Sequence, residues 1–131
     1  FWTLVSDPKY CNVDSDIKEA LDRRDSGKPD AAFHALKALE SVLKILSDEL
    51  GRTRGTEKGA ADFVDNLVSL KLGRYVETWE AEALKSLFRD IRNPLGHGSG
   101  NAQPLALSTE QATWVIENAM SWIKSLVRRK P

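Results

Sequence analysis

Residues 31–50 read AAFHALKALESVLKILSDEL, and this stretch carries the clearest structural pattern in the chain. Its large apolar side chains recur every three or four residues, at Phe33, Leu36, Leu39, Leu43, Leu46 and Leu50. This spacing places them on one face of an α-helix, which Val42 and Ile45 widen. Asp30 is a candidate N-cap, and Gly51 is a natural C-terminal stop. The stretch therefore predicts a long amphipathic helix at the centre of a bundle.

Four further segments show helical periodicity between cap and stop residues. They span about 14–26, 60–72, 78–93 and 108–127. Leu70 belongs to the apolar face of the second of these segments. Thr78 is expected to cap the helix that follows it, and Ser108 with Gln111 has the spacing of a capping box. The chain is therefore predicted to be all-α, a four- to five-helix bundle over residues 14–131.

Residues 1–13 have no helical period and contain the turn signal Asp7-Pro8. They are predicted to form a tail packed over the bundle or the remnant of an upstream region. Because the chain starts at Phe1 and not at a methionine, we expect an excised or processed domain.

Length and composition place the chain among globular proteins. Its 131 residues are enough for about one domain, with 41% hydrophobic and 29% charged residues. The 19 basic and 19 acidic side chains cancel, which argues against nonspecific coating of nucleic acid but allows a local basic cleft. The lone Cys11 leaves no partner for an internal disulfide or a cysteine zinc cluster, and it favours the cytoplasm. No apolar run reaches the roughly 20 residues that a membrane span needs.

Residues 92–100, RNPLGHGSG, gather residue types that packing does not require. Pro94 lacks an N–H donor and predicts that the preceding helix ends there. Arg92 lies on the flank of that helix's apolar stripe, where it could line a cleft. His97 supplies an imidazole, a group whose ordinary pKa lies near neutral pH. The glycines Gly96, Gly98 and Gly100 would let the backbone approach a ligand closely. This loop is therefore the predicted functional site.

Arg92, four intervening residues and His97 resemble the R-x4-6-H signature of HEPN domains, which are small helical bundles and include many metal-independent ribonucleases. Asn93 follows the arginine and Gly98 follows the histidine. This fuller string is most similar to HEPN domains of bacterial abortive-infection proteins of the AbiJ and Abi C-terminal type. The helical pattern over 14–127 is compatible with that family. The resemblance implies a HEPN-like four- to five-helix bundle.

The resemblance also implies a function, endoribonuclease action in abortive-infection or toxin–antitoxin defence. Arg92 would bind and stabilise the scissile phosphate, His97 would act as general base or acid, and Asn93 would orient the site. Gly98 and Ser99 are the expected substrate-binding residues. HEPN ribonucleases pair two domains so that both motifs face one cleft. RNA and a second copy are therefore the expected partners, with a regulatory or antitoxin partner or an upstream domain; no cofactor or metal is expected.

Several alternatives remain open. The chain could be a noncatalytic module for dimerisation, RNA binding or partner sensing. Arg92 could serve structure, by capping carbonyls or pairing with a carboxylate, or it could bind a nucleotide or small phosphate with the glycine loop. Some HEPN toxins carry a tyrosine two residues after the histidine, a target of nucleotide transfer by an antitoxin. Ser99 stands there in this chain, which puts that regulation in doubt.

Other candidate residues have simpler interpretations. His34 is expected at the surface or at a boundary, because no second ligand accompanies it at metal spacing. Trp114 and Trp122 are expected in the core or an interface rather than as base-stacking platforms. The loop 52–59 carries three basic residues against Glu57, and it is either solvated or a contact to RNA backbone or a partner.

Overall fold

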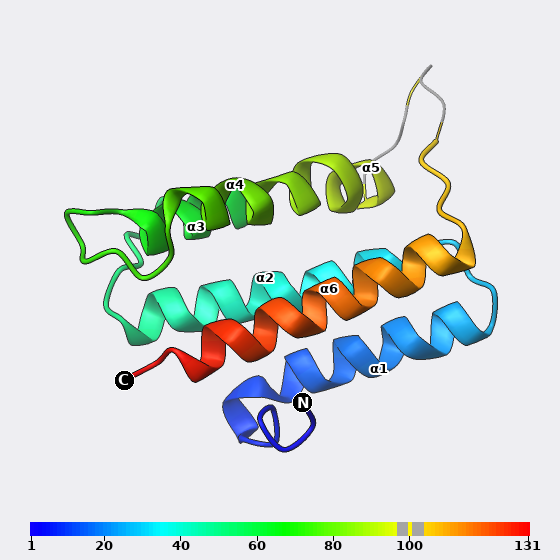
Figure 1. The fold of residues 1–131 in the computed structure, drawn as a ribbon, viewed down its shortest axis with the longest axis horizontal. Coiled ribbons are helices and arrows are strands. Elements are labelled where there is room, and N and C mark those ends of the chain that lie inside the picture. The colour runs from blue at the N-terminus through cyan, green and yellow to red at the C-terminus, as the bar shows by residue number, and fades with distance from the viewer. Residues whose placement is uncertain (97–99, 101–103) are drawn as a thin grey trace.

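The computed structural model describes residues 1–96, 100 and 104–131, and within these ranges it is all-helical with no strand (Figure 1). The elements are the 3₁₀ helix η1 (Pro8–Tyr10), α1 (Cys11–Asp25), α2 (Ala31–Glu49), α3 (Ala60–Val68), α4 (Thr78–Leu87), the π-helix η2 (Phe88–Arg92), α5 (Asn93–Gly96) and α6 (Thr109–Arg128). The predicted all-α bundle is confirmed. No helix in the described ranges is long and apolar enough to cross a membrane.

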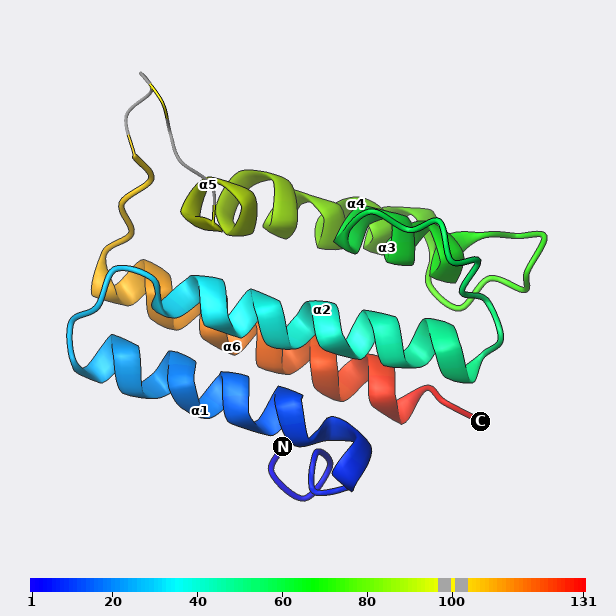
Figure 2. The same cartoon turned by 180° about the vertical axis from the view of Figure 1, so that it is seen from behind.

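Helix α2 is the centre of the bundle, as its periodicity predicts. It packs against α1, α6, α3 and η2. Leu36, Leu39, Leu43 and Leu46 on its apolar face are fully buried. Full burial of such a side chain contributes about 1.5–3 kcal/mol. Figures 1 and 2 show α1, α2 and α6 running alongside one another, with α3 and the α4–α5 rod forming a second layer over α2. The central helix therefore holds both layers together.

The predicted start of α1 and the predicted end of α3 were wrong. Helix α1 begins at Cys11 and not near residue 14, because the turn at Asp7-Pro8 leads directly into η1 and then α1. Val5 and Tyr10 are buried, so the first residues pack onto the bundle. Helix α3 ends at Val68, and Leu70 is 75% exposed rather than part of an apolar face. The chain turns there because the backbone N–H groups of Tyr75 and Val76 both donate to the Leu67 carbonyl.

Only some of the predicted helix caps are confirmed. The box of Ser108 and Gln111 is confirmed at the start of α6. Helix α4 is capped by Glu77, which forms a box with Glu80, so the prediction of Thr78 was wrong by one residue. Asp30 occupies the N-cap position of α2, but its carboxylate makes no cap bond and accepts from Arg23 at 3.0 Å.

The helix before Pro94 does not end at the proline, contrary to the prediction. The chain widens into the π-helix η2, whose closing bond runs from the Asn93 N–H to the Phe88 carbonyl. Helix α5 then begins at Asn93, so Pro94 lies in a first turn, where the missing N–H donor costs nothing. The insertion of a π turn therefore lets the rod continue to Gly96. π turns of this kind are frequent at functional sites.

Candidate functional site

Arg92 is held in place by a carboxylate from the central helix. Its Nη2 donates to Oε1 of Glu40 at 2.9 Å. Glu40 is only 7% exposed and projects from α2, whereas Arg92 ends η2. The Arg92 side chain keeps 25% of its surface exposed. The pair therefore joins the two layers and leaves the guanidinium at the edge of the core.

An aromatic ring supports the same guanidinium. The Cζ atom of Arg92 lies 5.6 Å from the ring centroid of Phe33, within the range of a cation–π contact. Gly96 packs so closely on this ring that a Cβ added there would lie 2.7 Å from Cε2 of Phe33. Packing against Phe33 therefore explains why a glycine ends α5. A close approach to a ligand, which the sequence suggested, is not needed to account for Gly96.

The structure brings two of the predicted catalytic residues together. Nη1 of Arg92 donates to Oδ1 of Asn93 at 3.2 Å. The predicted residues His97, Gly98 and Ser99 lie outside the described residues. Gly100 is described and has a φ of +57°, a conformation that favours glycine. The described part of the site is therefore an arginine oriented by one carboxylate, one amide and one ring.

A basic cleft adjoins Arg92 and Asn93. It has a volume of about 530 Å³ and lies between the start of α3 and the rod of α4 and η2. Lys58, Lys85, Arg89 and Arg92 line it, and Phe88 forms part of its wall. None of the described lining residues is acidic. In a chain of zero net charge, this cleft is a local concentration of positive charge that suits a phosphate group.

A family model for the HEPN-like domain, Abi_C, matches residues 12–130, which is most of the chain. The chain belongs to this HEPN-like family. It is therefore a module of the defence-related, abortive-infection type, as the residues around Arg92 indicated. Neither the curated proteins nor the solved structures gave a match to it.

Reasoning from sequence missed the residues of this HEPN-like domain that orient Arg92. Glu40 was overlooked although it follows Leu39 and stands three residues before Leu43, within the buried stripe of α2. An acidic side chain at such a position needs a cationic partner, which was the available signal. Arg89 and Lys85 carried no comparable signal, because charged residues on a helix are most simply solvated.

The loop before α3 is organised by Glu57. Its carboxylate accepts from the backbone N–H groups of Arg54, Gly55 and Thr56 and from Nδ2 of Asn66. These bonds, with that from Arg54 foremost, hold the pKa of Glu57 down to about 2. The carboxylate is therefore ionised at neutral pH and fixes the loop that carries Lys58 to the cleft.

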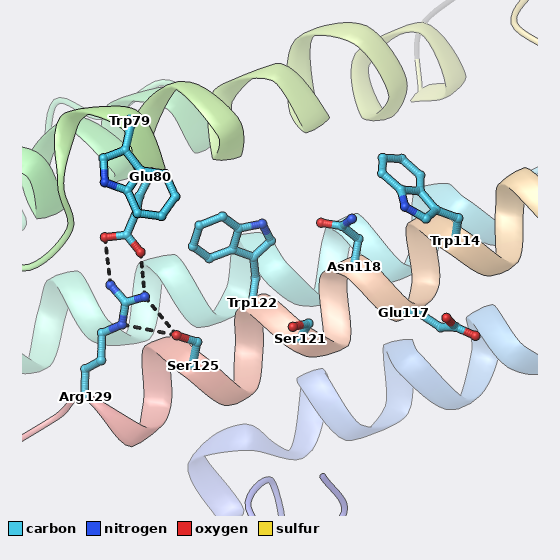
Figure 3. A pocket seen from close by; sticks show the side chains of 9 residues that line it. All are labelled: Trp79, Glu80, Trp114, Glu117, Asn118, Ser121, Trp122, Ser125 and Arg129. Carbon is cyan, nitrogen blue, oxygen red and sulfur yellow. Dashed lines mark hydrogen bonds and ion pairs between the residues drawn. The ribbon is translucent and has the colours of Figure 1, made fainter.

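A second hollow in the HEPN-like domain lies between α4 and α6 (Figure 3). Trp79, Trp114 and Trp122 line it, and the first two are 71% and 55% exposed. Trp114 therefore does not lie in the core, and of the two expected positions an interface stays a prediction. At one end of this hollow, Arg129 donates two hydrogen bonds to the buried carboxylate of Glu80, at 2.9 and 2.5 Å. Arg129 thereby lowers the pKa of Glu80.

Proposed function

We propose that this HEPN-like domain is a metal-independent endoribonuclease of antiviral, abortive-infection or toxin–antitoxin type defence, acting in the cytoplasm. Its active site would be completed by a second copy of the chain. A regulatory or antitoxin partner, or an upstream region, would keep it silent until needed. Membership of the Abi_C family supports the defence setting, and the geometry around Arg92 supports the chemistry.

The reaction sets three chemical tasks. The 2′-OH must lose its proton, the phosphorane must be stabilised, and the leaving 5′-oxygen must gain a proton. The imidazole of His97 could do the first or the third, and each such role is typically worth 10²- to 10⁴-fold. The guanidinium of Arg92 could bind the nonbridging oxygens and do the second. One arginine and one histidine are too few for all three tasks, whereas two copies around a two-fold axis are enough.

The observation that carries this proposal is the orientation of Arg92. Glu40 fixes one side of the guanidinium, Phe33 supports its face, and Asn93 binds a second nitrogen, yet the side chain still lines the basic cleft. A donor that is held before substrate arrives needs no reorganisation during the reaction. The ion pair with Glu40 also agrees with the alternative that Arg92 has a structural role. The two roles are compatible, because Arg92 keeps exposed surface at the cleft.

The proposal is tested by incubating the purified chain with single-stranded RNA in excess EDTA. We expect cleavage products with 2′,3′-cyclic phosphate ends, because the 2′-oxygen is the nucleophile. The same RNA with 2′-O-methyl riboses should stay intact. Cleavage that stops when EDTA is added, or that proceeds on the methylated RNA, would contradict the mechanism.

The exposed tryptophans favour a second candidate function, a noncatalytic interaction module. Large apolar side chains gathered at one exposed hollow are common at protein interfaces. Under this alternative, the chain would bind a partner through Trp79 and Trp114 and would leave RNA uncut in the EDTA assay. Size-exclusion chromatography with light scattering, run beside that assay, distinguishes the two functions. A folded monomer that is inactive on varied RNAs would favour the interaction module.

A further inference from the structure

The cleft beside Arg92 holds more positive charge than the cleavage mechanism uses. Lys58, Lys85 and Arg89 line it together with Arg92, and no described lining residue is acidic. Lys58 comes from the loop before α3, and the other three come from α4 and η2. Helix α3 packs beside α4 (Figure 2), and both segments contribute residues to the cleft lining. Cations from separate segments thus converge on one cavity.

The carboxylates that accompany these cations stand outside the cavity lining. Asp65 pairs with Lys85 at 2.6 Å, and Asp90 pairs with Arg89 at 3.0 Å. The attraction between Arg89 and Asp90 is weak, because both side chains are more than half exposed and solvent screens their charges. Asp62 lies near the cleft, where its Oδ2 accepts from the Lys58 backbone N–H at 2.7 Å. Among the described residues, Lys58 itself forms no ion pair, so its charge is left for a ligand.

The start of α3 lines the same cavity. Gly59, its N-cap, has no side chain that could accept from the first N–H groups of the helix, and Gly59, Ala60 and Ala61 all line the cleft. The first turn of a helix carries a partial positive charge and attracts anions. A volume of about 530 Å³ is in the range of ligand pockets. The side-chain cations and the helix start therefore favour the same kind of ligand.

We propose that this cleft is a backbone-phosphate subsite for RNA. Lys58, Lys85 and Arg89 would bind a phosphate next to the one that Arg92 holds for cleavage, so the inference rests on the proposed function. The subsite would position the strand and contribute to affinity, and Arg92 would belong to both the subsite and the reaction. Replacing Lys58 or Arg89 should therefore act on KM rather than on kcat.

The test measures binding without turnover. The probe is a fluorescein-labelled single-stranded RNA of about 12 nucleotides with 2′-O-methyl riboses, and fluorescence anisotropy follows its binding over a range of KCl concentrations. Lys58→Ala and Arg89→Ala are each expected to weaken binding about 3- to 10-fold. Each should also lower the slope of log affinity against log salt by about 0.7, the value for one lost phosphate contact on a single strand. Lys71→Ala, which removes an exposed lysine beyond the far end of α3, is the charge-matched control.

Gly59 offers a test that does not threaten folding. Its φ is −174°, and an added Cβ would meet nothing within 4 Å, so other residues fit there. Gly59→Asp would cap α3 and place a negative charge in the cleft, so it should keep or raise the melting temperature and weaken RNA binding. Gly59→Asn adds a side chain of the same shape without the charge, and it should weaken binding less.

The possible outcomes distinguish a failure of the subsite proposal from a failure of the nuclease proposal. Weaker binding by Lys58→Ala, Arg89→Ala and Gly59→Asp, with Lys71→Ala like the wild type, supports the subsite even if the wild type cuts no RNA. Equal binding by all variants overturns the subsite, and so does an equal loss in the Lys71→Ala control. Those two results would leave the nuclease proposal standing if the wild type still cleaves RNA in EDTA.

Discussion

Replacing Arg92 or His97 by alanine is expected to lower the rate of RNA cleavage by about 10²- to 10⁴-fold. In the proposed mechanism, Arg92→Ala removes the donor for the phosphorane oxygens, and His97→Ala removes a proton acceptor or donor. In the proposed composite site, each substitution would remove two groups, one from each copy. Single-turnover cleavage of a labelled RNA in EDTA measures the effect.

Two further variants serve this experiment, Arg92→Lys as a conservative replacement and Lys71→Ala as a control. The lysine can still pair with Glu40, so the fold is kept, but it lacks the planar fork that binds two phosphate oxygens. We expect Arg92→Lys to lose at least about 10-fold in rate with little change in melting temperature. Lys71→Ala should cleave like the wild type. Wild-type rates in folded Arg92→Ala and His97→Ala proteins would remove both residues from the mechanism.

Replacing Glu40 by alanine is expected to harm both stability and cleavage. The substitution leaves the guanidinium of Arg92 without its buried partner. Breaking a buried pair costs about 3–5 kcal/mol, and the partial exposure of Arg92 reduces this to about 1–3 kcal/mol of unfolding free energy. Cleavage should fall by about 10-fold or more, because small errors in the position of a catalytic group are costly. Urea unfolding and single-turnover kinetics measure the two effects.

Glu80 provides a matched control, because it is a second buried glutamate paired with an arginine, and it lies at the hollow of Trp79 and Trp114, which shares no lining residue with the basic cleft. Glu80→Ala should lose stability on a similar scale and keep its cleavage rate at temperatures where it is folded. If Glu40→Ala and Glu80→Ala affect cleavage equally, the role of Glu40 is only structural.

The stability that the pair of Glu80 and Arg129 contributes is expected to depend on pH. Hydrogen bonds from Arg129 lower the folded-state pKa of Glu80 below its usual 4.5. The stability that this pair contributes is therefore fully present above pH 4.5 and is lost as the pH falls through the lowered pKa. Wild type and Glu80→Gln should accordingly differ in urea midpoint at pH 7 and converge in acid.

The sequence predicts the bundle well, because local periodicity controls it. The stripe from Leu36 to Leu46 is sufficient to place α2 in the core, and the box of Ser108 and Gln111 marks the start of α6. The prediction that the helix ends before Pro94 was wrong, because it assumed α-helical hydrogen bonds along the whole helix. A single π turn shifted the hydrogen bonds so that Pro94 falls in the first turn of α5, which begins at Asn93.

The candidate site was predictable only where its residues adjoin in sequence. Arg92 and Asn93 are neighbours within the motif, and the structure joins them directly. Glu40 is 52 residues from Arg92, and Lys58 reaches the cleft from a loop that Glu57 organises, so both depend on tertiary packing. Local sequence patterns do not indicate which of such distant segments lie close together in the fold. The basic cleft in a chain of zero net charge therefore emerges only in the folded protein.

The most direct test of the composite site is a mixing series of wild-type chain with His97→Ala, refolded together so that protomers exchange. If one active site needs both copies, only wild-type pairs cleave, and activity falls as the square of the wild-type fraction. An equal mixture should then retain about one quarter of the wild-type activity. Retention of about one half, with activity proportional to the wild-type fraction, would show that each chain cleaves RNA alone and would contradict the shared site.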